Sequence, residues 1–425
     1  MFKSQPTPPA KASPLKALSL FSGCGGFCEG IETAGFKVQA AVEWDRFACE
    51  TYKANFPRTP LFEGDIHEFL TDRSDHERVY GLSELDLVFG GPPCQGFSQI
   101  GTRRLDDERN ELYLQYTRIV ERMKPRMFLM ENVPNLALLN KGYFKNLILK
   151  KFASLGYSNT VMLKVSADDF GVPQARQRVI FIGTRDDLHF PFDLESFAQS
   201  TLGTLKVTRP VSVWEAISDL PAKVVDSGKT MPYPNFAGMS QFQREMRLDA
   251  TGKVYTKTAK KKRGLGRAAA MLHNHHTKEI QERRAKLIKL LKPGMKADSL
   301  PKDIWNGKRP EKWRRLHPDR PSYTILAHMH RDLSEWVHPK LNRWITVREA
   351  ARLQSFHDGF ILQGSEWQQL KQIGNAVPPL MGLALGRLAQ EVLAVLKNRS
   401  SSLTTSSKKK RLSKSPVQQV ISVKS

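Results

Sequence analysis

Short apolar runs alternate with amphipathic stretches through the first half of the chain. The amphipathic stretches, such as 110–123, have apolar residues at helical spacing. Five apolar runs have the length and composition of buried strands, and they lie at 16–21, 36–44, 85–91, 126–133 and 178–184. This alternation predicts a parallel sheet covered by helices on both faces, a doubly wound α/β fold. Such sheets bind ligands at the carboxyl ends of their strands, where polar residues cluster in this chain.

The alternation ends at about residue 190. Residues 191–343 are rich in Pro, Gly and basic residues, and 253–267 contains seven basic residues and no acid. A compact pattern resumes at 344 and ends in a helical stretch at 378–396. We therefore expect one α/β domain interrupted by a smaller basic domain, between two loose tails. The predicted parts are 1–14 (flexible tail), 15–190 (α/β domain), 191–343 (inserted domain), 344–397 (completion of the α/β domain) and 398–425 (disordered basic tail).

The charge of the chain indicates the kind of partner. The 425 residues include 66 Lys and Arg against 42 Asp and Glu, a net charge of +24. An excess of this size favours a polyanion, with nucleic acid first and an acidic membrane surface second. The alternative is a soluble protein with a basic tail. No apolar run reaches the roughly 20 residues of a membrane span, and the first residues lack the apolar block of a secretory signal, so we expect an intracellular protein.

Cysteine and histidine give little support to a metal site. The chain has four cysteines, and an intracellular location disfavours disulfides between them. Cys24 and Cys28 could form a metal-binding pair, but no second Cys or His pair follows at zinc spacing. The HNHH tract at 273–276 is interpreted as a polar loop or a surface that faces nucleic acid. We expect no metal.

Polar and glycine residues after the first strands indicate a nucleoside pocket. Glycines 23, 25 and 26 directly follow the first strand, where they allow a tight turn and close approach of a ligand, although a plain turn would look alike. Glu43 follows the second strand about twenty residues later and could accept hydrogen bonds from ribose hydroxyls. Trp44 offers a flat face for adenine, and Asp65 could receive an amine. Because no phosphate-binding loop is present, a nucleoside without phosphates, S-adenosylmethionine, fits best.

Cys94 stands after two prolines in the stretch GGPPCQGFS. The prolines restrict the backbone and present the thiol at a defined angle. A buried structural cysteine is the ordinary alternative. This cysteine, however, follows an apolar strand and opens a polar loop, which is a poor place for burial. The sequence therefore favours Cys94 as a nucleophile, reactive as its thiolate.

Charged residues near two further strands could complete a reactive site. Glu131 ends the next predicted strand and could reach whatever Cys94 attacks. Arg176 and Arg178 alternate just before a strand, so they would point to the same side and form a fork for phosphate or carbonyl oxygens; a solvated charged edge is the alternative.

A thiolate, a carboxyl group and a methyl donor together suit methylation of cytosine C5. Addition of the thiolate at C6 makes C5 nucleophilic, and a carboxyl group at N3 stabilises the charge that develops on the ring. A stacked base must first be flipped out of the duplex, at a cost of a few kcal/mol.

The chain resembles the DNA cytosine-5 methyltransferase family. The motifs LSLFSGCGGF, GGPPCQGFS, ENV, QARQR, REAARLQSF and IGNAVPP occur in that family's order and span residues 18–380. The resemblance implies a Rossmann-like, S-adenosylmethionine-dependent methyltransferase domain, with a target-recognition domain in place of 191–343. It also implies that Cys94 is the nucleophile and that Glu131 contacts N3 and the exocyclic amine. Arg178 would reach the base, and Arg176 would steady Glu131.

The same resemblance implies the binding residues. The loop from Gln95 to about residue 110 would close over flipped DNA. Residues expected to contact DNA are Gln95, Ser98, Arg103, Arg104 and Gln174. Residues expected to contact the cofactor are Phe21, Ser22, Gly23, Gly25, Gly26, Glu43, Trp44, Asp65, Ile66, Asn375 and Val377.

Two residues depart from the family pattern without touching its catalytic residues. Cys24 stands where many relatives have an apolar residue, and His357 where a proline is usual. We predict a monomeric modification enzyme of a bacterial restriction–modification system, cytoplasmic and associated with the nucleoid. It would act on double-stranded DNA, and any cognate endonuclease would act separately. The alternatives are a tRNA cytosine-5 methyltransferase of the same fold, although its distinctive Cys-Phe-Thr is not found, and a non-catalytic DNA-binding regulator.

Overall fold

The structure is a computed structural model of the chain. It describes residues 13–69, 80–93, 111–138, 142–233, 238–247, 271–305, 307, 313–327 and 335–398. None of the helices within these ranges is long and apolar enough to span a lipid bilayer.

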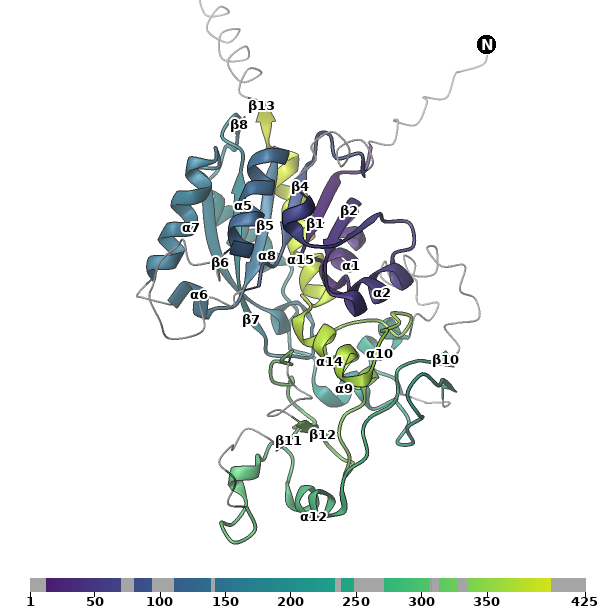
Figure 1. The fold of residues 1–425 in the computed structure, drawn as a ribbon. Coiled ribbons are helices and arrows are strands. Elements are labelled where there is room, and N and C mark those ends of the chain that lie inside the picture. Colours follow the sequence, from purple (N-terminus) through teal and green to yellow (C-terminus); the bar gives the residue numbers. More distant parts are fainter. Residues whose placement is uncertain are drawn as a thin grey trace, which may run out of the picture.

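A central seven-stranded sheet forms the upper part of the molecule (Figure 1). Its strands, in spatial order, are β3 (Leu61–Glu63), β2 (Lys37–Glu43), β1 (Lys16–Leu20), β4 (Leu87–Gly90), β5 (Met127–Asn132), β7 (Gln177–Thr184) and β6 (Asn159–Ser166). Pairing is parallel from β3 to β5, whereas β7 runs antiparallel to both β5 and β6. The doubly wound α/β fold with a mostly parallel sheet is therefore confirmed, and β7 is the one antiparallel strand of this sheet.

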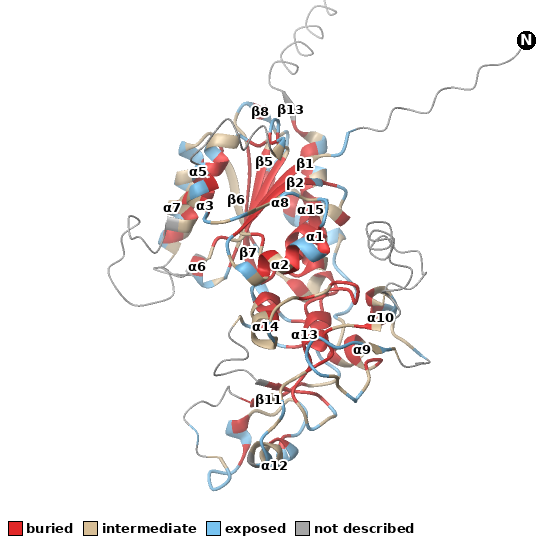
Figure 2. Cartoon of the chain, turned by 45° about the vertical axis from the view of Figure 1, so that its right-hand side comes forward, coloured by how far each residue is buried: buried red, intermediate tan, exposed pale blue. Residues whose placement is uncertain are grey.

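Two apolar layers cover the sheet, as the continuous apolar strands require. Along β1, Ala17 faces one layer and Leu18 the other. The first layer contains α1 (Gly26–Thr33), α2 (Arg46–Asn55) and α15 (Pro379–Val395), and the second contains α3 (Ile66–Phe69), α5 (Glu111–Met123) and α7 (Tyr143–Ser154). Figure 2 shows the inner strands of the sheet as buried between them, whereas the edge strands β3 and β6 are only partly covered.

The C-terminal helix α15 packs closely on α1. A Cβ atom added at Gly30 would lie 2.4 Å from the backbone of Gly382, so these helices meet backbone to backbone. A short strand pair follows, because β13 (Lys397–Asn398) pairs antiparallel with β8 (Leu188–His189). After the long excursion the chain therefore returns to pack on helices α1 and α8, beside the central sheet.

Packing against the α/β core continues beyond residue 190, the predicted start of the inserted domain. Helix α8 (Leu194–Thr204) packs against β6 and α15. Its residues Leu194, Ala198 and Leu202 are buried in the same core as the first layer of the sheet. They are spaced four residues apart, so one face of α8 is apolar and belongs to the α/β domain.

The rest of the excursion forms the lower part of the molecule (Figure 1). Helix α9 (Val213–Ile217) packs against both α10 (Gln241–Met246) and α13 (Val347–Leu353). Helix α13 in turn contacts α14 (Glu366–Asn375). A separate small core surrounds Ile288, Trp313 and Trp344 at the far end. Further elements here are β9 (Met231–Pro232), β10 (Met271–Leu272), α12 (Glu282–Leu290), β11 (Trp313–Arg315) and β12 (Glu335–Val337).

Candidate active site

An acid and an arginine meet at the edge where β5 ends and β7 begins. Because β7 runs antiparallel to β5, the first residues of β7 lie at the carboxyl end of β5. The Nε atom of Arg178 lies 2.7 Å from Oε1 of Glu131, and the two side chains are 9% and 12% exposed. This charge-assisted contact fixes the carboxyl group of Glu131 in a largely buried pair at the edge of the sheet.

The stretch that leads to Cys94 lies against this acid. A Cβ atom added at Gly91 would be 2.8 Å from Oε2 of Glu131, so glycine makes room for the carboxyl group. The amide of Asn132 donates a hydrogen bond of 3.2 Å to the carbonyl of Pro92. Residues 91–93 are therefore held beside Glu131, immediately before the predicted nucleophile. Outside the described residues lie Cys94, Gln95, Ser98, Arg103 and Arg104.

The three described cysteines are poorly suited to nucleophilic attack. Cys24, Cys28 and Cys49 are buried. Burial raises the pKa of Cys24 to about 12 and that of Cys49 to about 12. Since the thiolate is the reactive form, neither side chain would supply a nucleophile at neutral pH.

Arg176 makes different contacts from those expected. Its guanidinium is buried and donates from Nη1 to the carbonyl of Ile325 and from Nη2 to the carbonyl of Gly374, both at 3.0 Å. The ion pair with Glu131 comes instead from Arg178. Arg176 precedes β7, which begins at Gln177, so strand alternation does not set its direction.

Gln174 also differs from its prediction. Its side chain is fully buried, whereas a direct DNA contact needs an accessible amide. The amide oxygen accepts a hydrogen bond of 2.9 Å from the backbone of Ile325, and the amide nitrogen donates to the carbonyl of Leu353 at 3.2 Å and to the side chain of Gln354. Gln174 thus joins segments of the protein to one another.

The glycine turn after β1 has the conformation that its sequence suggests. Positive φ angles occur at Phe21 (52°), Gly23 (56°) and Gly25 (101°). At Gly25 an added Cβ would lie 2.3 Å from the ring of Phe56, and at Gly23 it would meet nothing within 4 Å. Ser22 is buried, and its hydroxyl lies 2.9 Å from that of Ser19. The turn is therefore tightly packed on one side and open at Gly23.

Glu43 connects this turn to the end of β2. Its Oε2 accepts a hydrogen bond of 2.7 Å from the backbone N–H of Gly23, and its Oε1 accepts bonds from Trp44 (3.0 Å) and Asp45 (2.9 Å). Burial raises the pKa of Glu43, while these three backbone donors act in the opposite direction. Trp44 is 76% exposed, so its ring is available to a ligand. The sequence suggested a ribose contact for Glu43 but not this structural role.

The remaining predicted cofactor residues lie around the same turn. The backbone N–H of Gly64 donates to the carbonyl of Glu43 at 3.0 Å, which places Asp65 and the buried Ile66 next to the end of β2. A Cβ atom added at Gly26 would lie 2.4 Å from the carbonyl oxygen of Val377. The exposed Asn375 ends α14 two residues earlier. Segments distant in the sequence therefore lie together around this turn.

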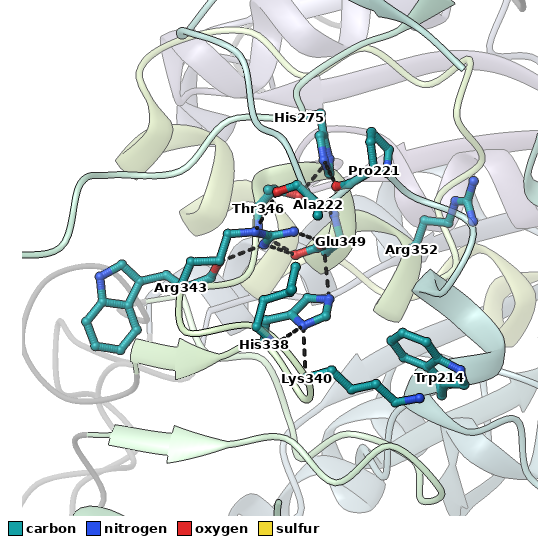
Figure 3. Close-up of polar contacts among 12 residues, drawn as sticks. Trp214, Pro221, Ala222, His275, His338, Lys340, Arg343, Thr346, Glu349 and Arg352 are labelled. Atoms are coloured by element: carbon teal, nitrogen blue, oxygen red, sulfur yellow. Dashed lines mark hydrogen bonds and ion pairs between the residues drawn. The ribbon is translucent and has the colours of Figure 1, made fainter. Parts of the chain in front are cut away.

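The HNHH tract is not a surface loop. His275 is fully buried, with Nε2 2.8 Å from the carbonyl of Pro221 and Nδ1 3.2 Å from the hydroxyl of Thr346 (Figure 3). Asn274 is largely buried and donates to the carbonyl of Leu362 at 3.0 Å. The tract therefore joins the lower part of the molecule to α13. No group of three or more His, Cys, Asp or Glu residues suited to a metal ion occurs in the described part of the chain.

An exposed tyrosine and an arginine lie near the residues that precede β7, and the sequence pattern did not select them. Residues 322–327 run beside 173–176, with the N–H of Ala175 bonded to the carbonyl of Ser322 at 2.8 Å. Tyr323 is 45% exposed, and the guanidinium of Arg314 lies 3.7 Å from the centre of its ring. This segment resembles the family in its sequence, but only the fold places it beside the strand that carries Arg178.

The sheet order and the glycine turn define the class of protein, a Rossmann-like α/β methyltransferase. Residues 15–390 match the model of the C-5 cytosine-specific DNA methylases, and the chain belongs to this family. It is a DNA cytosine-5 methyltransferase. Members of the family act on DNA and generally use S-adenosylmethionine as the methyl donor.

Similar proteins include bacterial type II methyltransferases. M.AgeI of Thalassovita gelatinovora is 34% identical, over 87% of this chain and 98% of its own length. M.DdeI of Desulfomicrobium norvegicum is 35% identical, over 87% of each chain. Among solved structures, a candidate DNA modification methyltransferase encoded within an E. coli prophage aligns with a TM-score of 0.69 and 27% identity, over 89% of this chain and 99% of its own. The S. pombe Dnmt2 methyltransferase, at 17% identity and a TM-score of 0.53, shares the fold.

Proposed function

We propose that this enzyme methylates C5 of a cytosine within a specific double-stranded DNA sequence, after flipping the base and bonding C6 to the sulfur of Cys94. The observation that carries the proposal is the Glu131–Arg178 pair, held beside the residues that lead directly into Cys94. A flipped cytosine bound at this edge could meet both the carboxyl group and the thiolate.

Cys94 and Glu131 have different roles in the proposed reaction. The Cys94 thiolate adds to C6, and the ring electrons make C5 nucleophilic. Because Arg178 holds Oε1 of Glu131, Oε2 is directed toward Gly91, which precedes Cys94 by three residues in the sequence. The carboxyl group can then hydrogen-bond at N3 and the exocyclic amine. Once C5 carries the methyl group, loss of its proton to a base lets the C6–S bond break, which expels the thiolate and restores the aromatic ring.

The residues around the glycine turn fit S-adenosylmethionine. Gly23 is open where a side chain would otherwise project, Glu43 fixes the turn, and the ring of Trp44 is exposed. When bound, this cofactor supplies an electrophilic methyl group. Residues that would hold it are Phe21, Ser22, Gly23, Gly25, Gly26, Glu43, Trp44, Asp65, Ile66, Asn375 and Val377.

The part of the chain from the end of α8 to residue 343 would serve as the target-recognition domain. Its exposed Tyr323 and the adjacent Arg314 are suited to contact DNA beside the active site. The type II relatives support a role in a bacterial restriction–modification system, with any endonuclease a separate protein. We propose that the enzyme acts as a monomer on DNA in the nucleoid.

A trapping experiment tests this proposal. Duplex DNA that contains 5-fluorocytosine at the target base should form a denaturation-resistant adduct in the presence of S-adenosylmethionine, because fluorine cannot leave as a proton does. Cys94→Ser should form no adduct, while Cys49→Ser serves as the matched control and should form it normally. Parallel assays with tRNA and unmodified DNA decide the substrate. Methyl transfer to tRNA alone, or DNA binding without any transfer, would overturn the proposal in favour of the tRNA enzyme or the regulator.

A further inference from the structure

Two segments with different predicted ligands pack directly against each other. We call residues 322–327 the recognition segment and residues 374–377 the cofactor segment. A Cβ atom added at Gly374 would lie 2.4 Å from the carbonyl carbon of Leu326 and 2.5 Å from the nitrogen of Ala327. The end of α14 therefore rests on the backbone of the recognition segment, and only glycine permits this approach.

The cofactor segment also touches the glycine turn. Gly26 approaches the carbonyl of Val377, where an added Cβ would be 2.4 Å away. The turn, the cofactor segment and the recognition segment thus form one packed stack. A shift of one layer must displace the next, because these contacts are between backbones rather than flexible side chains.

Arg176 bridges the two segments. Its Nη1 donates to Ile325 in the recognition segment and its Nη2 donates to Gly374 in the cofactor segment, each at 3.0 Å. The planar guanidinium fixes the geometry of both bonds, so one side chain sets the separation of the two carbonyls. A lysine at this position would present a single point of charge and could not reproduce the fork.

Gln174 and Gln354 reinforce the same bridge. The amide of Gln174 binds the backbone of Ile325 and the side chain of Gln354. Gln354 in turn donates to the carbonyl of Ala376, in the cofactor segment, at 2.7 Å. Two parallel routes therefore join the recognition segment to the cofactor segment, and both pass through buried polar groups whose contacts are costly to break.

The charge of Arg176 is retained in this setting. Burial, and then the nearby charge of Arg178, lower the pKa of Arg176 to about 9, while Glu131 acts in the opposite direction. The guanidinium is therefore still protonated at neutral pH, and all its N–H donors are present. A buried cation cannot easily exchange its carbonyl partners for water, so the bridge favours one arrangement of the two segments.

We infer that Arg176 is a positioning residue that couples DNA binding at the recognition segment to S-adenosylmethionine binding at the cofactor segment. This inference rests on the proposed function. Each ligand would favour the arrangement that the other needs, so each would tighten the binding of the other by the same factor. Arg176 would act through Ile325 and Gly374 rather than by touching the cytosine.

The coupling is measured without turnover. The dissociation constant of a duplex containing the target sequence is determined with and without saturating S-adenosylhomocysteine. For the wild type, the dissociation constant without S-adenosylhomocysteine should be about five or more times the constant with it, which lies in the usual range of coupling between sites. Arg176→Lys and Gly374→Ala should each bring this ratio close to one. Arg176→Lys removes the two-pronged hydrogen bonding of the guanidinium, and Gly374→Ala forces the recognition segment and the cofactor segment apart. Gly203→Ala, in α8, is the control, since its added Cβ meets nothing within 4 Å.

The outcomes separate this inference from the proposed function. Circular dichroism confirms that each variant is folded, and Arg176→Lys carries the test if Gly374→Ala does not fold. A wild-type ratio near one, or an unchanged ratio in the folded variants, would overturn the coupling while leaving the proposed function intact. A wild type that binds neither DNA nor S-adenosylhomocysteine would overturn the proposed function itself.

Discussion

The Nε atom of Arg178 lies 2.7 Å from Oε1 of Glu131, and this contact depends on the direction of β7. If β7 ran parallel to β5, its first residues would lie at the opposite edge of the sheet and the two side chains could not meet. The antiparallel direction of β7 thus brings Arg178, near the start of β7, to the end of β5, where Glu131 lies. A buried pair of this kind both holds the carboxyl group and keeps its charge balanced.

Replacing Glu131 by glutamine should slow methyl transfer by about 100-fold or more, in the range typical of a lost acid–base or charge-stabilising group. The amide keeps the size of the side chain but cannot supply a carboxyl group at N3. The rate is measured in single turnover with saturating DNA and cofactor. Glu121→Gln, at an exposed position on α5, is the control. A rate for Glu131→Gln within threefold of the wild type would contradict this role.

Gly91→Ala should lower the rate of methyl transfer while leaving cofactor binding intact. Its added Cβ would be 2.8 Å from Oε2 of Glu131, so the carboxyl group must move away from the residues that precede Cys94. Gly91 does not have a positive φ angle, so backbone strain is not expected. Rates and calorimetric binding constants are compared with those of Gly203→Ala. Normal turnover in Gly91→Ala would show that the carboxyl group does not need this position.

Much of the fold could be predicted from local patterns. The apolar runs that became β1, β2, β4, β5 and β7 are buried on both faces, so their composition alone marks them. Strand β6 was not predicted because its first half is only partly covered at the edge of the sheet, so its sequence mixes polar and apolar residues. The direction of β7 could not be predicted, since it depends on how the chain crosses the sheet.

The polar residues were harder to predict because their roles depend on partners distant in sequence. Gln174 and the HNHH tract have the composition of a ligand-binding surface, yet their amide and imidazole groups join segments inside the protein. Arg176 likewise looks like a partner for Glu131 until the positions of Ile325 and Gly374 are known. In each case the sequence shows that the side chain can form hydrogen bonds, but the partner is known only once the fold is known.

Arg314→Gln should weaken DNA binding and reduce its dependence on salt. A guanidinium stacked on Tyr323 is held in place for a phosphate, and losing one phosphate contact should lower the slope of log K against log salt by about one. Fluorescence anisotropy over a salt series gives this slope. Arg387→Gln, exposed on α15, should leave it unchanged. An unchanged slope in Arg314→Gln with poorer sequence discrimination would instead indicate contact with a base.

Arg352→Met should destabilise the protein by about 3–5 kcal/mol, the usual cost of breaking a buried charge pair. The fully buried Arg352 contacts Asp219 at 2.6 Å and Asp358 at 2.6 Å, which would be left without their shared partner. Urea unfolding provides the free energy. Arg46→Met removes the exposed pair with Glu50 and should cost no more than about 1 kcal/mol. Equal losses of unfolding free energy in the two variants would mean that the buried cluster around Arg352 stabilises the protein no more than an exposed ion pair does.

The buried His338 should make the protein less stable in mild acid. Its Nδ1 accepts hydrogen bonds from the backbones of Lys340 (3.1 Å) and Leu341 (3.0 Å), which requires an unprotonated nitrogen (Figure 3). Burial lowers the pKa of His338 to about 4; nearby Glu349 acts to raise it, and the charge of Arg343 acts to lower it. Since the unfolded chain takes up the proton near pH 6.5, stability is lost as the pH falls from about 6.5 toward 4.

His338→Asn tests this dependence, because an amide oxygen can accept the same backbone bonds without titrating. Between pH 7 and pH 5 the free energy of unfolding of the wild type should fall by about 2 kcal/mol more than that of the variant. Burial also lowers the pKa of His275, so both proteins should keep some loss of the same sign. Glu349 should not contribute in this window, since its pKa of about 2 affects stability only below the unfolded value of 4.5. Parallel pH profiles for the two proteins would show that the imidazole of His338 accepts its proton in the folded state.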